Sequence, residues 1–159
     1  MKRKCFSFLI LWIIFGATLR AEAFVSFSVS GNWMKTINSS ELIFGPEIIL
    51  PSTYTSSSNA VTMNINANGN ESWMVHVSKN NSIWDPRLRL YIRRTGNGSG
   101  TGTISGGTSF QEITSLNQTF FSGRKKYSNI PVQFQLTGVS LYIPPSSNIT
   151  TITYTITEQ

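Results

Sequence analysis

Apolar and polar residues alternate along much of the chain after its first 23 residues. Successive side chains of a β-strand point to opposite faces, so strict alternation predicts strands with one buried face and one exposed face. Thr, Ser, Val, Ile and aromatic residues dominate these segments, as is typical of strands, and helical periodicity is nearly absent. The clearest alternating segments are 25–30, 61–66, 73–78, 87–94, 132–137 and 151–157.

The spacing of these segments predicts about eight to ten short strands in an all-β fold. A strand with one apolar face needs a second sheet to cover that face. We therefore expect an antiparallel β-sandwich of the immunoglobulin-like or pilin-like kind. Residues 24–159 have a suitable length for one such domain.

Two glycine-containing stretches predict turns. Asn68-Gly69 tolerates the positive φ angles of a tight turn, so we expect the flanking strands to pair as a hairpin. The stretch Thr95–Gly107 holds six of the twelve glycines. Because glycines bury little surface, this stretch predicts a mobile loop or a loose, bulged hairpin.

The first 23 residues have the three parts of an export signal. Lys2-Arg3-Lys4 is a positive region, Phe6–Leu19 is apolar, and Ala21 and Ala23 supply the small side chains of a cleavage site after Ala23. The apolar run is shorter than the roughly 20 residues of a membrane span. We expect a secreted, periplasmic or cell-surface protein that meets the membrane only through this signal, with an uncleaved anchor as the alternative.

The residue types available after the signal argue against an enzyme. Residues 24–159 contain no cysteine, one histidine (His76) and one aspartate (Asp85), whereas most side-chain catalysis uses these types. We expect no cofactor, no metal, no disulfide and no catalytic residue. A small glycan-cleaving enzyme that uses Glu71 and Glu112 as a carboxylate pair remains an alternative.

The charge of the chain after the signal is mild. Residues 24–159 carry nine basic and six acidic residues, a formal net charge of +3. This charge and the expected export disfavour nucleic acid as a partner.

Both ends of the chain after the signal alternate as strands do. The first of these segments presents Val25, Phe27 and Val29 on one face. These side chains could complete the sheet of a neighbouring subunit by strand addition. The alternatives are the first strand of a self-contained sandwich and an exposed edge that pairs at random.

The chain resembles bacterial fimbrial or surface-adhesin subunits. The resemblance rests on the signal, the cysteine-free sandwich, the alternating first strand, the tryptophan-containing segment 70–77 and the closing segment 143–157. Ser146-Ser147 departs from the glycine expected in the turn before that last strand. The resemblance implies an exported structural or adhesive protein whose partners are other subunits, of its own or a homologous kind.

Basic residues gather in two groups, of which the first is the candidate site for an anionic partner. Arg87, Arg89, Tyr91 and Arg93 share the outward face of one strand, and Arg94 follows them; the second group is 124–126. Guanidinium groups bind carboxylate, sulfate or phosphate in a bidentate manner, so acidic glycans and anionic surface polymers are candidate partners. A solvated strand face is the alternative.

Aromatic residues support a second function, that of a carbohydrate-binding module. Trp33, Trp84 and Tyr91 are candidates for a platform on which sugar rings stack, whereas Trp73 is expected in the core.

Overall fold

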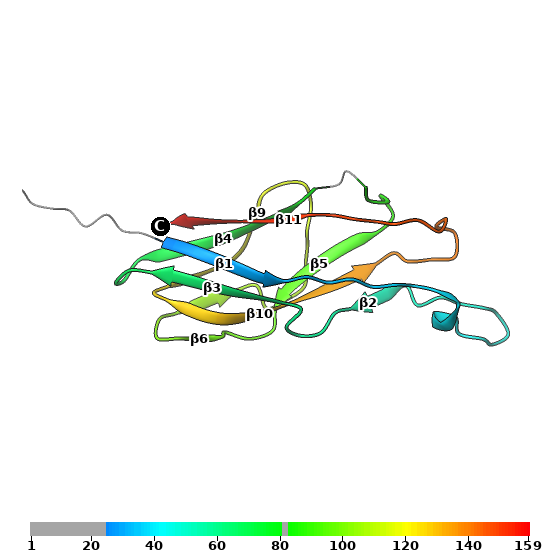
Figure 1. The fold of residues 1–159 in the computed structure, drawn as a ribbon, viewed down its shortest axis with the longest axis horizontal. Coiled ribbons are helices and arrows are strands. Elements are labelled where there is room, and N and C mark those ends of the chain that lie inside the picture. The colour runs from blue at the N-terminus through cyan, green and yellow to red at the C-terminus, as the bar shows by residue number, and fades with distance from the viewer. Residues whose placement is uncertain (1–24, 81–82) are drawn as a thin grey trace, which may run out of the picture.

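The computed structural model describes residues 25–80 and 83–159 as two antiparallel sheets packed face to face (Figure 1). The predicted β-sandwich is therefore confirmed. The expected export signal, Met1 to Ala23 with its cleavage residues Ala21 and Ala23, lies outside the described residues. A single 3-10 turn, η1 (Ser39–Glu41), interrupts the strands, with Asn38 as its N-cap.

The described residues form eleven strands, slightly more than expected. The larger sheet contains β1 (Val25–Gly31), β2 (Thr53–Thr55), β3 (Val61–Ala67), β5 (Arg89–Arg94), β6 (Ser99–Gly100), β8 (Gln111–Glu112) and β10 (Tyr127–Thr137). The smaller sheet contains β4 (Ser72–Lys79), β7 (Ile104–Gly106), β9 (Gln118–Arg124) and β11 (Ile152–Glu158).

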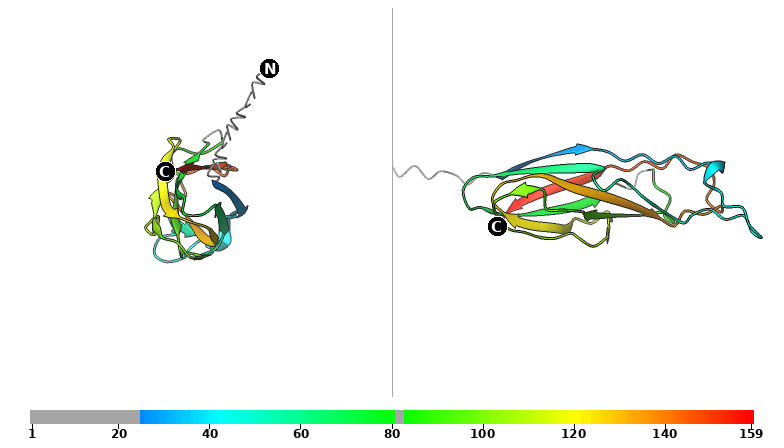
Figure 2. Two further views of the ribbon diagram at one scale, coloured as in Figure 1. Left: turned by 90° about the vertical axis from the view of Figure 1, so that its left-hand side faces the viewer. Right: turned by 90° about the horizontal axis from the view of Figure 1, so that it is seen from below.

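Strand β10 organises the larger sheet because it is the longest strand, with 11 residues. Its neighbours in the sheet order β1-β3-β10-β5-β8 are β3 and β5. It also pairs with β2 and β6, which lie off this path. The smaller sheet has the order β11-β4-β9-β7. The end-on view of Figure 2 shows the two layers facing each other.

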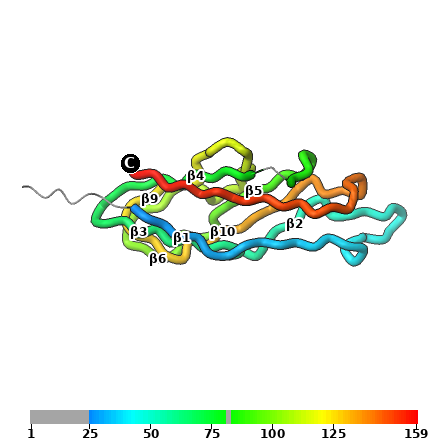
Figure 3. Tube along the Cα trace, turned by 45° about the horizontal axis from the view of Figure 1, so that its top comes forward, coloured from blue at the N-terminus to red at the C-terminus, as the bar shows by residue number. Residues whose placement is uncertain are grey.

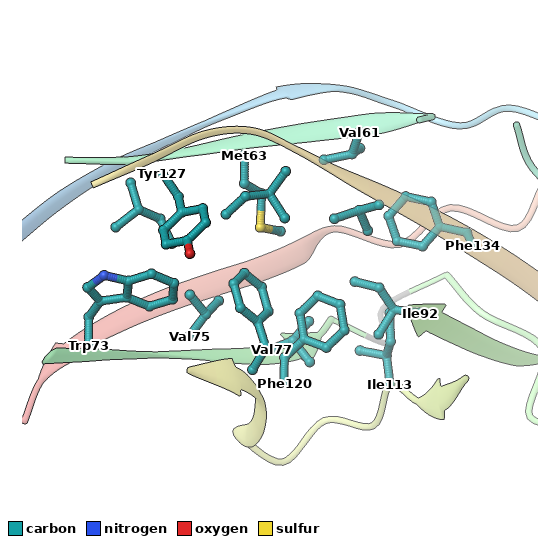
Figure 4. Close-up of a cluster of buried hydrophobic side chains, with 14 of the residues drawn as sticks. Val61, Met63, Trp73, Val75, Val77, Ile92, Ile113, Phe120, Tyr127 and Phe134 are labelled. Atoms are coloured by element: carbon teal, nitrogen blue, oxygen red, sulfur yellow. The ribbon is translucent and has the colours of Figure 1, made fainter. Parts of the chain in front are cut away.

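The core lies between the layers, where the apolar faces of the alternating strands meet (Figure 4). Trp73 on β4 is fully buried and packs edge-on against Phe121 and Tyr127, and its Nε1 donates to the carbonyl of Lys125 at 2.8 Å. Met63 faces this group from the opposite sheet. The expected core position of Trp73 is confirmed. An indole N–H needs a partner when it is buried, and the turn carbonyl supplies one.

The hairpin expected at Asn68-Gly69 is wrong. Gly69 does adopt a positive φ of 70°, but β3 belongs to the larger sheet and β4 to the smaller one. The turn is therefore a corner between the layers. Crossing there lets Met63 and Trp73 approach the core from opposite sides, which a hairpin within one sheet would not allow.

The glycine-rich segment 95–107 is also not the expected loose loop or hairpin. It supplies β6 to the larger sheet and β7 to the smaller one, so it crosses between the layers. A Cβ added to Gly102 would lie 1.8 Å from the carbonyl oxygen of Arg124. Glycine at this position permits close backbone packing, and the segment is part of the sandwich.

Candidate functional site

One long side of the sandwich is bordered by two strands that are neighbours without pairing. Figure 3 shows β1 and β11 running alongside each other in opposite directions, β1 as an edge of the larger sheet and β11 as an edge of the smaller one. At one end the backbone N–H of Val25 donates to Glu158 Oε1 at 2.8 Å. We call this the open side: β1, β11 and the adjoining segments 32–38 and 143–150.

Both edge strands of the open side are long and regular. Each has seven residues, and each pairs with its inner neighbour without a register shift, β1 with β3 and β11 with β4. Neither strand contains Lys, Arg or Pro. Natural proteins commonly protect exposed edges with such residues, with bulges or with very short strands, so these two edges are available for pairing with another strand.

The opposite side of the sandwich has short edge strands, as is typical of sheet edges that are protected against pairing with another chain. Strand β8 has two residues and β7 has three. The segment 95–118 crosses between the layers here, and the buried guanidinium of Arg94 on β5 donates to the carbonyl of Gly106 on β7 at 2.8 and 2.9 Å. We call this the closed side: β7, β8 and the segment 95–118 that contains them.

A groove of about 1190 Å³ follows the open side. Its apolar lining comes from both layers and from the segments beyond them, including Val29, Trp33, Trp84, Leu136 and Ile152. Large exposed apolar side chains continue from it, notably Met34 at 87% exposed and Tyr142 at 89%. Exposed apolar surface on this scale is typical of a binding surface.

Tyr154 lines the groove and has an unmet hydrogen-bonding group. It lies on β11, and its buried hydroxyl forms no hydrogen bond to any described residue. Burial raises the pKa of this hydroxyl, so it stays protonated and can donate. Sequence analysis did not single out Tyr154, although its alternation with Thr153 and Thr155 places it on the inward face.

The three residues expected to take part in strand addition lie on β1. Val25 and Phe27 are half-buried and pack against the core, while Val29 is 37% exposed and lines the groove. Within this structure β1 completes its own sheet by pairing with β3. Exchange of β1 between subunits remains a prediction.

Arg89, Tyr91 and Arg93 lie on the outward face of β5, whereas Arg87 lies in the turn before this strand, so its expected place on the strand is wrong. The three arginines already have partners within the chain. Arg87 makes a bidentate pair with Asp85, at 2.6 and 3.0 Å, which holds the pKa of that carboxyl at about 2. Arg89 contacts Glu112 at 3.2 Å. Arg93 donates to Gln133 and covers the Phe110 ring, and Tyr91 between them is half-buried. Binding of an anion by this face remains a prediction.

Arg94 does not belong to this face. It is 3% exposed and points between the layers, where it donates to the carbonyls of Gly96 and Gly106 and to Asn97 Oδ1. Its guanidinium also lies 5.6 Å from the Phe121 ring centroid. The expected grouping of Arg94 with the outward arginines is therefore wrong. In the alternation of the strand, Arg94 has the same position as Leu90 and Ile92, whose side chains point inward.

The three aromatic residues proposed as a platform lie on two different surfaces. Trp33 and Trp84 both line the groove, whereas Tyr91 is on the outward face of β5. Trp33 stacks parallel to Phe134, with centroids 6.3 Å apart, so one of its faces is covered. Trp84 donates its Nε1 hydrogen to the carbonyl of Leu88 at 2.8 Å.

The carboxylates weighed for glycan cleavage lie at opposite ends of β4. Glu71 precedes this eight-residue strand, and Glu112 is near Lys79 at its far end, a separation of roughly 25 Å. Within residues 25–80 and 83–159, no three His, Cys, Asp or Glu side chains gather in an arrangement that could hold a metal ion. No helix in this part of the chain is long and apolar enough to cross a membrane.

Comparison of the chain with protein-family models, with curated proteins and with solved structures finds no match.

Proposed function

We propose that this protein is an exported structural or adhesive subunit that joins neighbouring subunits by β-strand addition at its open side. One observation carries the proposal: two regular, unprotected edge strands, β1 and β11, border a large apolar groove. Strand addition draws its affinity from main-chain hydrogen bonds along a free edge and its specificity from pockets that receive alternate side chains. The open side supplies both features.

The alternating face of β1 fits the role of the added strand. Val25, Phe27 and Val29 are apolar, while the serines between them are polar, which suits a strand that is covered on one face. Two versions of strand addition follow. Either β1 leaves its own sheet and pairs with β3 of a neighbour, or a neighbour's strand adds to the free edge of β1 or β11.

The first test is the size of the purified protein over a range of concentrations, measured by size-exclusion chromatography with light scattering. We expect association that increases with concentration. Val29→Lys places a charge at the groove beside the edge of β1 and should leave the protein monomeric, because an inward-pointing charge opposes edge pairing. Ser78→Lys adds the same charge on β4, which is not an edge strand, and should associate like the wild type.

Deletion of residues 24–30 distinguishes the two versions. Exchange of β1 requires this strand, so the shortened protein should lose association and accept an added peptide with the sequence of residues 24–31. A wild type that stays monomeric at all concentrations, and whose size is unaffected by Val29→Lys and by the deletion, would contradict strand addition.

A carbohydrate-binding module is the second candidate, and one observation favours it: Trp33 and Trp84 both line the groove. Glycan-array binding at two salt concentrations tests this function. Binding that persists in high salt and is lost in Trp33→Ala would support recognition by the aromatic residues. Binding to acidic glycans that fades with salt would instead implicate Arg87, Arg89 and Arg93.

A further inference from the structure

Lys79 is a basic residue on the inward face of the smaller sheet. It is the last residue of β4 and continues the inward row of Trp73, Val75 and Val77, and only 9% of it is exposed. Its backbone N–H donates to the carbonyl of Thr114 at 2.8 Å, which fixes the end of the strand next to the segment 113–115. Side chains of lysine are almost never buried to this degree without a partner.

The ammonium group of Lys79 has an aromatic contact and no ionic one. Its Nζ lies 4.7 Å from the centroid of the Trp84 ring. Among the residues that the structure describes, none forms an ion pair with it, whereas exposed Lys35 pairs with Glu41 at 2.6 Å. Burial lowers the pKa of Lys79, as expected for a charged group removed from water. A cation–π contact alone leaves the ammonium donors of this group unused.

A pocket of about 330 Å³ lies at this lysine, and Arg89 of the arginine face forms part of its wall. It is lined by Lys79, Trp84, Pro86, Leu88, Arg89, Glu112 and the segment 113–115. Small-molecule sites have volumes of about 300 to 1,000 Å³, so this pocket suits a ligand of monosaccharide size. Thr114 and Ser115 belong to the lining, and the Thr114 hydroxyl accepts hydrogen bonds from the Leu116 N–H and from Gln118 Nε2.

The charges that line the pocket favour an anion. Glu112 lies 3.2 Å from Arg89 and also attracts Lys79, so the two positive charges of the lining share one negative charge and a net positive charge remains. A singly charged ligand would neutralise the site, whereas a doubly charged phosphate would leave an excess negative charge beside Glu112. The ionisable groups of the lining are these three.

We propose that this pocket binds the carboxylate of a small acidic ligand, such as a hexuronate, with Lys79 Nζ donating to the carboxylate from the pocket wall. The hydroxyl groups of Thr114 and Ser115 are the additional donors and acceptors for the rest of the ligand. This site lies at Lys79 and Glu112 and not at the free edges of β1 and β11, and its wall shares Trp84 and Leu88 with the groove.

The test is an NMR titration of the ¹⁵N-labelled protein with glucuronate, using glucose as the matched neutral sugar. We expect glucuronate to shift the amide signals of Lys79, Thr114 and Ser115 and to raise the pKa of Lys79, and glucose to do neither. Lys79→Met keeps an unbranched side chain that is one atom shorter and removes its charge, so it should weaken glucuronate binding by roughly tenfold or more. Lys35→Met removes a paired lysine elsewhere and should bind like the wild type.

Glu112→Gln provides the opposite change. It removes the negative charge from the pocket and frees Arg89, so glucuronate should bind several-fold more tightly. Lys79→Met should also fold normally, because the substitution removes a buried charge; its unfolding transition checks this.

Each of the following results would overturn the proposal: glucose shifts the same amides to the same extent as glucuronate, Lys79→Met binds glucuronate as tightly as the wild type, or inorganic phosphate binds more tightly than glucuronate. An absence of any shift at Lys79, Thr114 and Ser115 up to the solubility limit of glucuronate would also overturn it.

Discussion

On the closed side of the sandwich the chain crosses between the sheets and ties them together, whereas on the open side two strands meet without pairing. The closed side has cross-layer hydrogen bonds from Arg94 to Gly106 and from Gln111 Nε2 to the carbonyl of Thr119. Its edges are only two and three residues long. The open side has two seven-residue edges and an apolar groove.

This difference indicates a division of tasks between the two sides. Buried polar ties and close glycine packing hold the layers together on one side. Regular edges without lysine, arginine or proline would promote uncontrolled pairing on the other side unless pairing is their purpose. The comparison therefore predicts that changes on the closed side cost stability, while changes on the open side mainly alter association.

The largest effect on stability is expected from Arg94→Met. This change keeps an unbranched side chain but leaves the carbonyls of Gly96 and Gly106 without these donors in a partly buried place. We expect the free energy of unfolding to fall by about 3 kcal/mol. Denaturant unfolding measures it, and Arg93→Met on the outward face of the same strand is the control, with an expected cost of about 1 kcal/mol or less. An equal loss of unfolding free energy in the two variants would contradict the role of Arg94 in holding the two layers together.

A smaller but clear effect is expected from Gly102→Ala. The added methyl group would lie 1.8 Å from the carbonyl oxygen of Arg124, so the backbone must shift. Overpacking of this kind costs about 1–3 kcal/mol. In Gly45→Ala the nearest atom is 3.7 Å away, and this variant should unfold like the wild type. If Gly102→Ala also unfolds like the wild type, the glycine-rich segment is not closely packed.

The ion pair of Arg87 with Asp85 belongs to neither the open side nor the closed side, and it makes the stability of the fold depend on pH. Hydrogen bonds from Arg87 lower the pKa of Asp85 from 3.8 to about 2, so this carboxylate stabilises the fold above its unfolded pKa. The contribution is lost as the pH falls through about 4 towards 2. Asp85→Asn should therefore differ from the wild type at neutral pH, and the difference should shrink over this acidic range in unfolding experiments. A difference that stays constant down to pH of about 2 would contradict the lowered pKa.

The smallest effect on stability is expected from Glu158→Gln, at the end of the open side. Glu158 Oε1 accepts the hydrogen bond from the Val25 N–H in an exposed place, and an amide oxygen can replace it. We expect a change of about 0.5 kcal/mol or less in the free energy of unfolding. A cost approaching that of Arg94→Met would show that the open side is held as firmly as the closed side.

Alternation predicted the strands and their inward faces well, because the period of two is a local property. Trp73, Val132 and Phe134 are buried as their parity requires. The sequence could not assign strands to sheets. Asn68-Gly69 suits a hairpin and a corner equally, and the choice depends on packing between Met63 and Trp73, which are brought together only by the fold.

The remaining errors have two causes. Arg94 has inward parity after Ile92, but charged residues are usually exposed, and its grouping with the neighbouring arginines followed that tendency instead of parity. In the glycine-rich segment, the close approach of Gly102 to Arg124 cannot be seen in the sequence, because it joins backbones from different sheets. The groove was missed for the same reason: its lining comes from segments far apart in the chain.

The division of tasks between the two sides predicts that the open side opens more readily than the closed side, and two buried thiols test this prediction directly. Residues 24–159 contain no cysteine, so Met63→Cys and Ile113→Cys, each in a Cys5→Ser background, place one thiol on β3, which pairs with β1, and one on the closed side. Both positions are fully buried in the wild type. Labelling rates measured at increasing denaturant separate local opening from global unfolding. The account predicts faster, weakly denaturant-dependent labelling at residue 63 and labelling through global unfolding at residue 113; equal rates with equal denaturant dependence would contradict it.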